Sequence, residues 1–478
     1  MSISGALSNA LSGLTASSRM ADIVSANVSN VLTDGYARRE LALQSQRDGN
    51  GVSVAGVTRH VDNALLGDLR LADSAFAGSE TRATFAKALE RAIGTPGEPD
   101  SLAGKLTALE SSLVAAAARP EETSRLQTVT QDADALAKSL NTISSRIETL
   151  RSAADADIAR TVKSLDESLE NVATLNDHIV TARASGRNTA TLEDQRQRVV
   201  DAIAEIVPVR QLPRQNGKIA LVTTGGALLF DGRGATLEFD EKPLVAAHMT
   251  QDNGLLSGIR INGQAVRTDA NGPLAGGKLG ALFDNRDRAG VEAQRSVDAI
   301  ARDLVERLSD PGPDSTLTGG APGLFTDAGD AVDPATETGL AGRIRLNDKV
   351  DPSDASTAFH IRDGLEALTP GPAGSADLLQ RLSDALSAPR SIATGPGTRS
   401  SAGHVADMTG RIANARLSAD QQVSFANSQA TELRSLQLEN GVDTDAEMQR
   451  LLLVEQAFSA NARMIQTIDE MMQTLLRI

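Results

Sequence analysis

The glycine-rich segment 272–279, GPLAGGKL, is the part of this sequence that comes nearest to a catalytic motif. Gly272, Gly277 and Lys278 have the spacing of a phosphate-binding loop. That loop needs a serine or threonine hydroxyl after the lysine to hold Mg²⁺, and the chain has Leu279 in this place. We therefore interpret the segment as a glycine-containing turn that leads into a helix.

The other side chains that could bind metal or carry out catalysis have the wrong spacing. The five histidines form no zinc-binding pattern. Cysteine is absent, which excludes disulfides, thiolate chemistry and cysteine-based zinc sites. Asp443, Asp445 and Glu447 resemble part of a calcium loop, but the glycine and the terminal glutamate of an EF-hand are missing. We predict no catalytic residue, no cofactor and no metal site, and we do not expect an enzyme.

Composition narrows the class of protein. The net charge of −15 and the pI near 4.9 argue against binding of nucleic acid or of an anionic membrane, because both need clustered Lys and Arg. Aromatic residues make up only 2% of the 478 residues, so the core must consist of closely packed Ala, Leu, Val and Ile, as in helix bundles. No segment resembles a membrane span or a cleavable signal peptide, so we expect a soluble protein.

Apolar residues at both ends of the chain recur at alternating steps of four and three, as in coiled-coil helices. The N-terminal stripe consists of Ile3, Leu7, Ala10, Leu14, Ser17, Ala21, Val24, Val28 and Val31. The C-terminal stripe consists of Met448, Leu451, Val454, Phe458, Asn461, Ile465, Ile468, Met472 and Leu475. Thr444 and Glu447 predict a capping box at the start of the second helix. We predict that the two helices, each about 45 Å long, pair with each other.

The N-terminal segment has few of the residues that stabilise a helix in water. Its only charged side chains before Gly35 are Arg19, Asp22 and Asp34, and most other positions are Ser, Asn, Thr, Gly or Ala. Ser, Asn and Gly are poor helix formers. We therefore expect this segment to be mostly disordered alone and to become ordered on assembly.

The predicted fold class is mainly α with an inserted β domain. Long helices fill most of the chain, whereas Pro208 and Pro213 open a stretch of short β-prone runs separated by glycine turns. We expect the helical arms to fold back, so that the termini meet at one end and the β unit lies at the other. The predicted division is a terminal coiled-coil helix at 1–35, the first part of a helical rod domain at 36–205, an antiparallel β domain at 206–275, a helix returning to the rod domain at 276–310, a loop-rich segment with short strands at 311–375, the second part of the rod domain at 376–438 and a terminal coiled-coil helix at 439–478.

Both ends of the chain carry motifs of the flagellar axial proteins. The segment ANVSNVLTDGYARRE at 26–40 resembles their amino-terminal motif, and GVDTDAEMQRLLLVEQAFSANARMIQTIDEMMQTLLRI at 441–478 resembles their carboxy-terminal motif. Tyr36 followed by Arg38, together with LEDQRQRVVDAIAEIVPV at 192–209, is similar to the flagellar hook-associated protein 1 (FlgK) family. Asp34 departs from the usual proline of that motif, and the β insertion is short for the family.

The resemblance implies a structural subunit of the bacterial flagellum, located at the junction between hook and filament and polymerising through its paired terminal helices. It implies contacts with other copies of the chain, with the hook protein and with the next hook-associated protein. It also implies an extracellular location, reached through flagellar type III export without a cleaved signal peptide, and an export chaperone at the C-terminal helix. The alternatives are another axial subunit, such as a hook or rod protein, and a cytosolic helical scaffold or enzyme.

The stripes and the resemblance together predict an assembly interface. Its residues are Ile3, Leu7, Leu14, Val24, Val28, Val31, Gly35, Tyr36, Arg38, Arg39, Leu451, Val454, Phe458, Asn461, Ile465, Ile468, Met472 and Leu475. In this hypothesis Gly35 ends the helix with a positive φ, Tyr36 fixes the exit direction of the chain, and Arg38 and Arg39 meet carboxylates of an adjacent subunit. The alternative is a loop anchor within one subunit. Asn461 either fixes the register of the helices or faces a neighbour.

Overall fold

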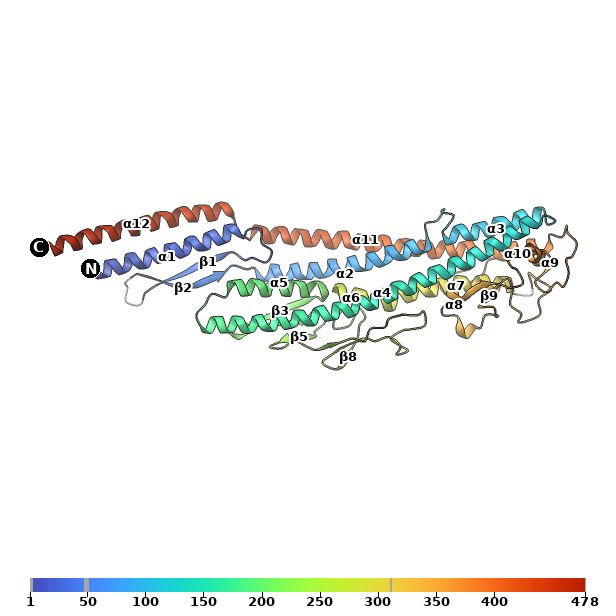
Figure 1. The fold of residues 1–478 in the computed structure, drawn as a ribbon, viewed down its shortest axis with the longest axis horizontal. Helices are drawn as coiled ribbons and strands as arrows, with labels where there is room; N and C mark the ends of the chain where they lie inside the picture. Colours follow the sequence, from blue (N-terminus) through green and yellow to red (C-terminus); the bar gives the residue numbers. More distant parts are fainter. Residues whose placement is uncertain (1–2, 47–50, 310–311, 478) are drawn as a thin grey trace.

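The computed structural model describes residues 3–46, 51–309 and 312–477, and it is an elongated bundle of long helices with small antiparallel sheets (Figure 1). The first and last described residues lie at the same end of the molecule. The predicted fold class, mainly α with an inserted β domain, is confirmed. The predicted division into domains stays a prediction, and its boundary between 310 and 311 lies outside the described residues.

Long helices run along the molecule and determine its length. They are α1 (Ile3–Ser29), α2 (Asn63–Ile93), α3 (Leu102–Ala118), α4 (Thr123–Ala184), α5 (Ala190–Ile206), α7 (Gly290–Ser309), α11 (Ser401–Glu439) and α12 (Thr444–Leu476). Shorter helices are α6 (Gly277–Asp284), α8 (Leu340–Arg343), α9 (Phe359–Asp363) and α10 (Asp377–Ser387). The helical turns are η1 (Gln215–Gly217), the π turn η2 (Asn285–Ala289), η3 (Pro334–Thr336) and η4 (Ala355–Thr357).

The strands form antiparallel sheets of two or three strands. Strands β1 (Arg39–Ser45) and β2 (Val52–Arg59) form a hairpin beside α1. The middle of the chain forms two sheets, β3 (Val209–Pro213), β4 (Ile219–Thr223) and β5 (Leu228–Asp231), and then β6 (Leu237–Glu238), β7 (Ile259–Ile261) and β8 (Gln264–Val266). Strands β9 (Phe325–Asp327) and β10 (Ile344–Leu346) pair near the end of the molecule opposite the termini.

The prediction that the β unit lies at the end opposite the termini is wrong. The sheets of β3–β8 lie along the side of α4, α5 and α6 instead (Figure 1). Helix α4 has 62 residues and carries the chain back from the far end before the first of these strands begins. There the sheet buries Phe230 against apolar side chains such as Leu165 and Ile203.

The β1–β2 hairpin is a second departure, because 36–205 is predicted as a helical rod. Its register pairs Arg39 with Arg59, with a bulge between Ala42 and Leu43. An Asp-Gly pair lies between the two strands in the sequence and is a usual hairpin signal, but β1 does not alternate apolar and polar residues, because Leu41, Ala42 and Leu43 are consecutive. The segment is too short for this signal to stand out among long helices.

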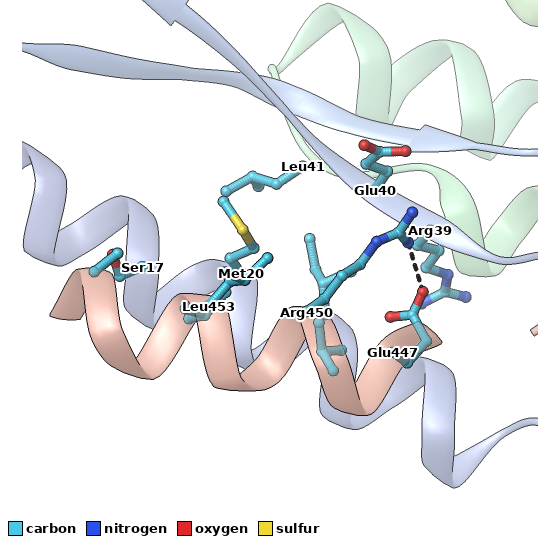
Figure 2. Close-up of a pocket in the computed structure, with 12 residues that line it drawn as sticks. Ser17, Met20, Arg39, Glu40, Leu41, Glu447, Arg450 and Leu453 are labelled. Atoms are coloured by element: carbon cyan, nitrogen blue, oxygen red, sulfur yellow. Dashed lines mark hydrogen bonds and ion pairs between the residues drawn. The ribbon is translucent and has the colours of Figure 1, made fainter. Parts of the chain in front are cut away.

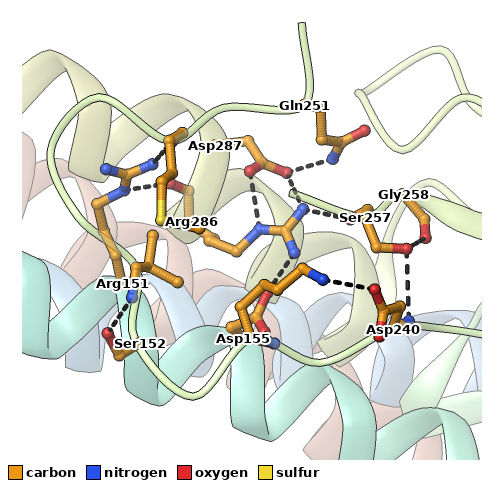
Figure 3. Close-up of polar contacts among 12 residues, drawn as sticks. Arg151, Ser152, Asp155, Asp240, Gln251, Ser257, Gly258, Arg286 and Asp287 are labelled. Carbon is orange, nitrogen blue, oxygen red and sulfur yellow. Dashed lines mark hydrogen bonds and ion pairs between the residues drawn. The ribbon is translucent and has the colours of Figure 1, made fainter. Parts of the chain in front are cut away.

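A buried network of charged side chains joins α4, η2 and the loop before β7 (Figure 3). Arg286 on η2 forms ion pairs with Asp155 on α4 and with Asp287, and its guanidinium lies 5.2 Å from the ring centre of Phe283. Arg151 on α4 donates from Nε to the Arg286 carbonyl at 3.0 Å. Because Arg286 and Asp155 are both fully buried, each charge depends on its partner.

The surroundings of Arg151 hold the same region together. Its Nη1 and Nη2 donate to the carbonyls of Ala246 and Met249, so one side chain binds the loop to the long helix. Burial lowers the pKa of Arg151, which nevertheless stays charged. A side chain at Gly290 would place its Cβ 2.6 Å from the Arg151 Cγ, so the glycine leaves the space that this arginine occupies.

Replacing Arg286 with Met should lower the free energy of unfolding by about 3–5 kcal/mol, because Asp155 would be left buried without a cation. The matched control is Arg288→Met, two residues further, whose 65% exposed side chain pairs with Asp284. The control should change stability by less than about 0.5 kcal/mol. Urea denaturation followed by circular dichroism measures both. Equal effects would show that the buried pair does not hold this region together.

Candidate assembly interface

Helices α1 and α12 pack antiparallel against each other within one chain, with α11 leading into α12 (Figure 1). Two contacts fix their register. At the base of the pair, Asn27 Nδ2 donates to Glu447 Oε2 at 3.0 Å. Midway along it, the Asn461 amide lies where a side chain at Gly13 would be, 2.8 Å from the position of its Cβ. Asn461 therefore lies in the seam between the two helices.

The predicted interface residues of the two helices differ in burial. The buried ones are Val24, Val454 and Ile468. The half-buried ones are Ile3, Leu7, Leu14, Val28, Val31, Leu451, Asn461 and Ile465. The exposed ones are Phe458, Met472 and Leu475. In the structure the N-terminal stripe already packs on α12 of its own chain, whereas the sequence predicts that this segment becomes ordered only on assembly. Contacts of these residues with another subunit stay a prediction.

Asn27 is the centre of a hydrogen-bond network at the base of the helix pair. Its side chain is fully buried, and its Oδ1 accepts from the Tyr36 hydroxyl at 2.8 Å and from the Arg39 backbone N–H at 3.0 Å. Its Nδ2 donates to the Arg39 carbonyl at 2.9 Å as well as to Glu447. One amide therefore joins the last turn of α1, the first residue of β1 and the first turn of α12, and the only tyrosine of the chain completes its set of partners.

Arg38 and Arg39 find their carboxylates within the same chain. Arg38 Nε lies 3.3 Å from Glu447 Oε1, and Glu447 is only 1% exposed. Arg39 Nη2 donates to Asp194 Oδ2 on α5 at 2.6 Å, and its guanidinium lies 4.7 Å from the ring centre of Tyr36. Within this chain the two arginines therefore anchor the loop after α1, which is the alternative to a contact between subunits. They can do so because the start of α12 and helix α5 both lie beside this loop. A contact of either arginine with another subunit stays a prediction.

Arg39 and Arg59 lie at the point where the hairpin meets the helical body. Asp194 also accepts from Arg59 Nε at 2.8 Å, and Arg59 Nη2 donates to Gln197 Oε1 at 2.8 Å. Arg39 and Arg59 are paired across the hairpin, so both strands bind α5 through one carboxylate. This contact sets the direction of the terminal arm, by which we mean α1, α12 and the β1–β2 hairpin.

Two details of the helix ends correct the predictions. Helix α1 ends at Ser29, so Gly35 does not end it. Gly35 has the predicted positive φ, 72°, but within a turn closed by the Tyr36 N–H and the Thr33 carbonyl at 3.1 Å. The cap of α12 is Asp443, not Thr444, since Asp443 Oδ1 accepts from the backbone N–H of Asp445. Glu447 therefore lies four residues after the cap, one more than a capping box requires, and its carboxylate accepts from Asn27 instead.

Sequence reasoning missed four residues of this site, namely Asn27, Arg59, Asp194 and Glu447 as a bonding partner. Asp194 lies inside the 192–209 segment that carries the family resemblance, and Asn27 lies inside the N-terminal motif. These two motifs were the sequence features that could have pointed to Asp194 and Asn27. The contacts themselves join residues up to 420 positions apart, which no local pattern reveals.

A small pocket of about 250 Å³ opens between α1, α12 and β1 above this network (Figure 2). Its walls are mostly apolar and include Met20 of α1, Leu41 of β1 and Leu453 of α12. Arg450 lies across its floor and donates to Glu447 Oε1 at 2.7 Å. No group of His, Asp or Glu side chains in the described part of the chain is arranged to hold a metal ion. No described helix is long and apolar enough to cross a membrane.

The single tyrosine allows a direct test of the network by absorbance titration. Burial raises the pKa of the Tyr36 phenol above its usual value of 10.0; Arg39 opposes this, while Asp194 and Glu447 add to it. The phenolate absorbance should therefore reach its midpoint above pH 10, and the stability that depends on the neutral phenol should be lost as pH rises through that midpoint. Asn27→Ala should lower the midpoint toward the usual value, because it removes the acceptor of the phenol hydroxyl, and Ser53→Ala on the hairpin should leave the midpoint unchanged. A wild-type midpoint at or below 10 would contradict the buried hydrogen bond.

Two family models match the chain. The flagellar hook-associated protein FlgK helical domain matches residues 86–311, which run from the end of α2 to α7. The flagellar basal body rod FlgEFG protein C-terminal model matches residues 439–478, which contain α12.

Named relatives agree with the first of these models. Flagellar hook-associated protein 1 of Bacillus subtilis (strain 168) is 24% identical over 499 residues, which covers 94% of this chain and 93% of the relative. The protein of the same name from Salmonella typhimurium is 26% identical over 48% of this chain and 43% of its own length. The protein of the same name from Escherichia coli (strain K12) is 22% identical over 64% of this chain and 57% of its own length. The match thus spans less than two thirds of the latter two proteins.

Among solved structures, the flagellar hook junction protein FlgK from Burkholderia pseudomallei matches with a TM-score of 0.46 and 21% identity, over 54% of this chain and 46% of that one. The helical-domain model, the relative aligned along nearly the whole chain and the motifs at both ends agree on one family. The chain belongs to the FlgK family of flagellar hook-associated proteins, which are structural proteins of the flagellum and not enzymes.

Proposed function

We propose that this protein is the subunit that joins hook and filament, and that it polymerises through its terminal arm. The observation that carries the proposal is the apolar surface that remains on the arm after α1 and α12 have paired. Leu453, Met464 and Leu475 are all exposed on α12. An apolar row on a helix that already has one partner indicates a second partner.

The base of the arm supports a mechanical role. The arm meets the helical body through Asp194, which binds arginines of both hairpin strands. At the same point Asn27 and Glu447 bind the two arm helices to each other. Since these contacts are buried and charge-assisted, they hold the arm in one direction, as a subunit that transmits force between neighbours requires.

The match of the helical body supports the proposed position over the alternatives. The model that matches α12 is the flagellar basal body rod FlgEFG protein C-terminal model, so α12 alone does not favour one position along the axis. The helical domain at 86–311 matches the model of the flagellar hook-associated protein FlgK helical domain. This match supports the junction over the rod or the hook.

The partners follow from this position. We propose that the arm contacts other copies of the chain, the hook protein on one side and the next hook-associated protein on the other. The apolar row on α12 must be covered before assembly, which supports an export chaperone at this helix and an extracellular destination reached through flagellar type III export.

Deleting the gene for this chain should leave cells with hooks that carry no filament, because the filament would have no subunit to attach to. Electron microscopy of purified hook complexes, with gold-labelled antibody on the complemented strain, measures both attachment and position. The label should form a single band between hook and filament. Filaments attached normally in the deletion strain, or label spread along the hook or the rod, would contradict the proposal.

A further inference from the structure

The methionines of this chain are concentrated on one helix and lie at its surface. Of the eight methionines in the sequence, half are on α12. They are Met448, Met464, Met471 and Met472, and their exposed fractions are 50%, 53%, 45% and 41%. Because the chain has no cysteine, these are the most exposed sulfur-containing side chains in the described residues.

The other methionines in the described part of the chain are sheltered from solvent. Met408 on α11 is only 1% exposed. Met20 on α1 is half-buried and lines the pocket beside β1 (Figure 2). Met249 is half-buried as well, and its Sδ accepts from the backbone N–H of Ala246 at 3.3 Å, which occupies a lone pair of the sulfur. A reagent dissolved in water therefore meets the methionines of α12 before the others.

The methionines of α12 do not hold the arm together. The buried side chains of this helix are Glu447, Val454 and Ile468, and none of them contains sulfur. Met471 instead lines an open groove of about 450 Å³ at the tip of the arm, beside Ile3 of α1. The methionines thus belong to the surface that remains after α1 and α12 have paired, on which the proposed polymerisation depends.

A thioether at a protein surface reacts directly with a hydroperoxide. The sulfur lone pair attacks one peroxide oxygen, an S–O bond forms as the O–O bond breaks, and the leaving hydroxide takes up the proton of the transferred oxygen to give water. Sulfur loses two electrons, and the peroxide gains them. The product is a sulfoxide, which is polar where the thioether was apolar, and methionine sulfoxide reductases reverse the reaction.

We propose that Met448, Met464, Met471 and Met472 form an oxidation site, at which hydrogen peroxide makes the exposed face of the unassembled arm polar and thereby stops its polymerisation. A sulfoxide buried in a contact between subunits would lose its hydrogen bonds to water without gaining others. The inference rests on the proposed function, because it needs this surface to be buried on assembly. The arm itself keeps its fold, since the buried side chains of α12 are not the ones that react.

Mild treatment of the full-length monomer with hydrogen peroxide tests this proposal. Peptide mass spectrometry identifies the methionines that carry oxygen, circular dichroism follows the helices, and sedimentation measures the polymer formed in ammonium sulfate, which strengthens apolar burial. One oxidised sample is then treated with the reductases for both sulfoxide epimers. The matched control chain keeps the apolar size of each side chain but removes its sulfur, through Met448→Leu, Met464→Leu, Met471→Leu and Met472→Leu.

The methionines of α12 should be oxidised before Met408 and Met249, and the helical content should stay unchanged. The yield of polymer should fall about tenfold, because the contact surface has become polar. Reductase treatment should restore the yield. The leucine control should polymerise equally well with and without peroxide.

An oxidised chain that polymerises like the untreated chain would overturn the proposal while the proposed function stands. Equal oxidation rates for all the methionines, or a leucine control that loses its polymer in peroxide, would also overturn it. If the leucine control does not polymerise at all, the reductase sample decides, and a yield that stays low there rejects the site. Untreated wild-type protein that forms no polymer would overturn the proposed function, and the effect of oxidation on assembly would fall with it.

Discussion

The hydrogen bond between Asn27 and Glu447 is the contact on which the rest of the terminal arm depends. Both side chains are buried, so an amide and a carboxylate are removed from water and must find partners in the protein. Tyr36, Arg38 and the backbone of Arg39 supply them. Because these partners come from α1, α12 and the start of the hairpin, the elements can satisfy one another only in one register. That register determines which faces of the two helices remain available to other molecules.

The helical body is a rigid support for the terminal arm. Helix α4 alone extends over 62 residues and contacts most other elements of the body, including the sheets on its side. Arg286 and Asp155 bind this helix to the turn before α7, inside the protein and away from the screening of salt. The described residues of the body form no large aromatic core, and the stiffness of the body comes from closely packed Leu, Ile and Val along helices that lie side by side. Such a molecule is suited to holding position and not to enclosing a substrate.

Periodic and local features were predictable from the sequence, and contacts between distant residues were not. The 3.5-residue stripes at Ile3–Val31 and Met448–Leu475 gave both terminal helices, and alternation after Pro208 gave the antiparallel strands. The place of those strands depends on where α4 turns back, which no local pattern encodes. The hydrogen-bond network around Asn27 was equally unpredictable. In the sequence, Glu447 has the spacing of a helix-capping residue, and only the packing of α1 beside α12 shows that it binds Asn27. The cap at Asp443 shifts the helix by one residue and so changes the role of Glu447.

The central claim is that the arm is already formed within one chain and that Asn27 and Glu447 hold it. Hydrogen exchange of the isolated monomer measures this directly, by comparing α1 and α12 with α4 in the wild-type chain and in Glu447→Ala. The account predicts protected amides in both arm helices of the wild type, and loss of that protection in the variant while α4 stays protected. Rapid exchange throughout α1 and α12 of the wild type would contradict it, and would mean that the two helices pair only on assembly.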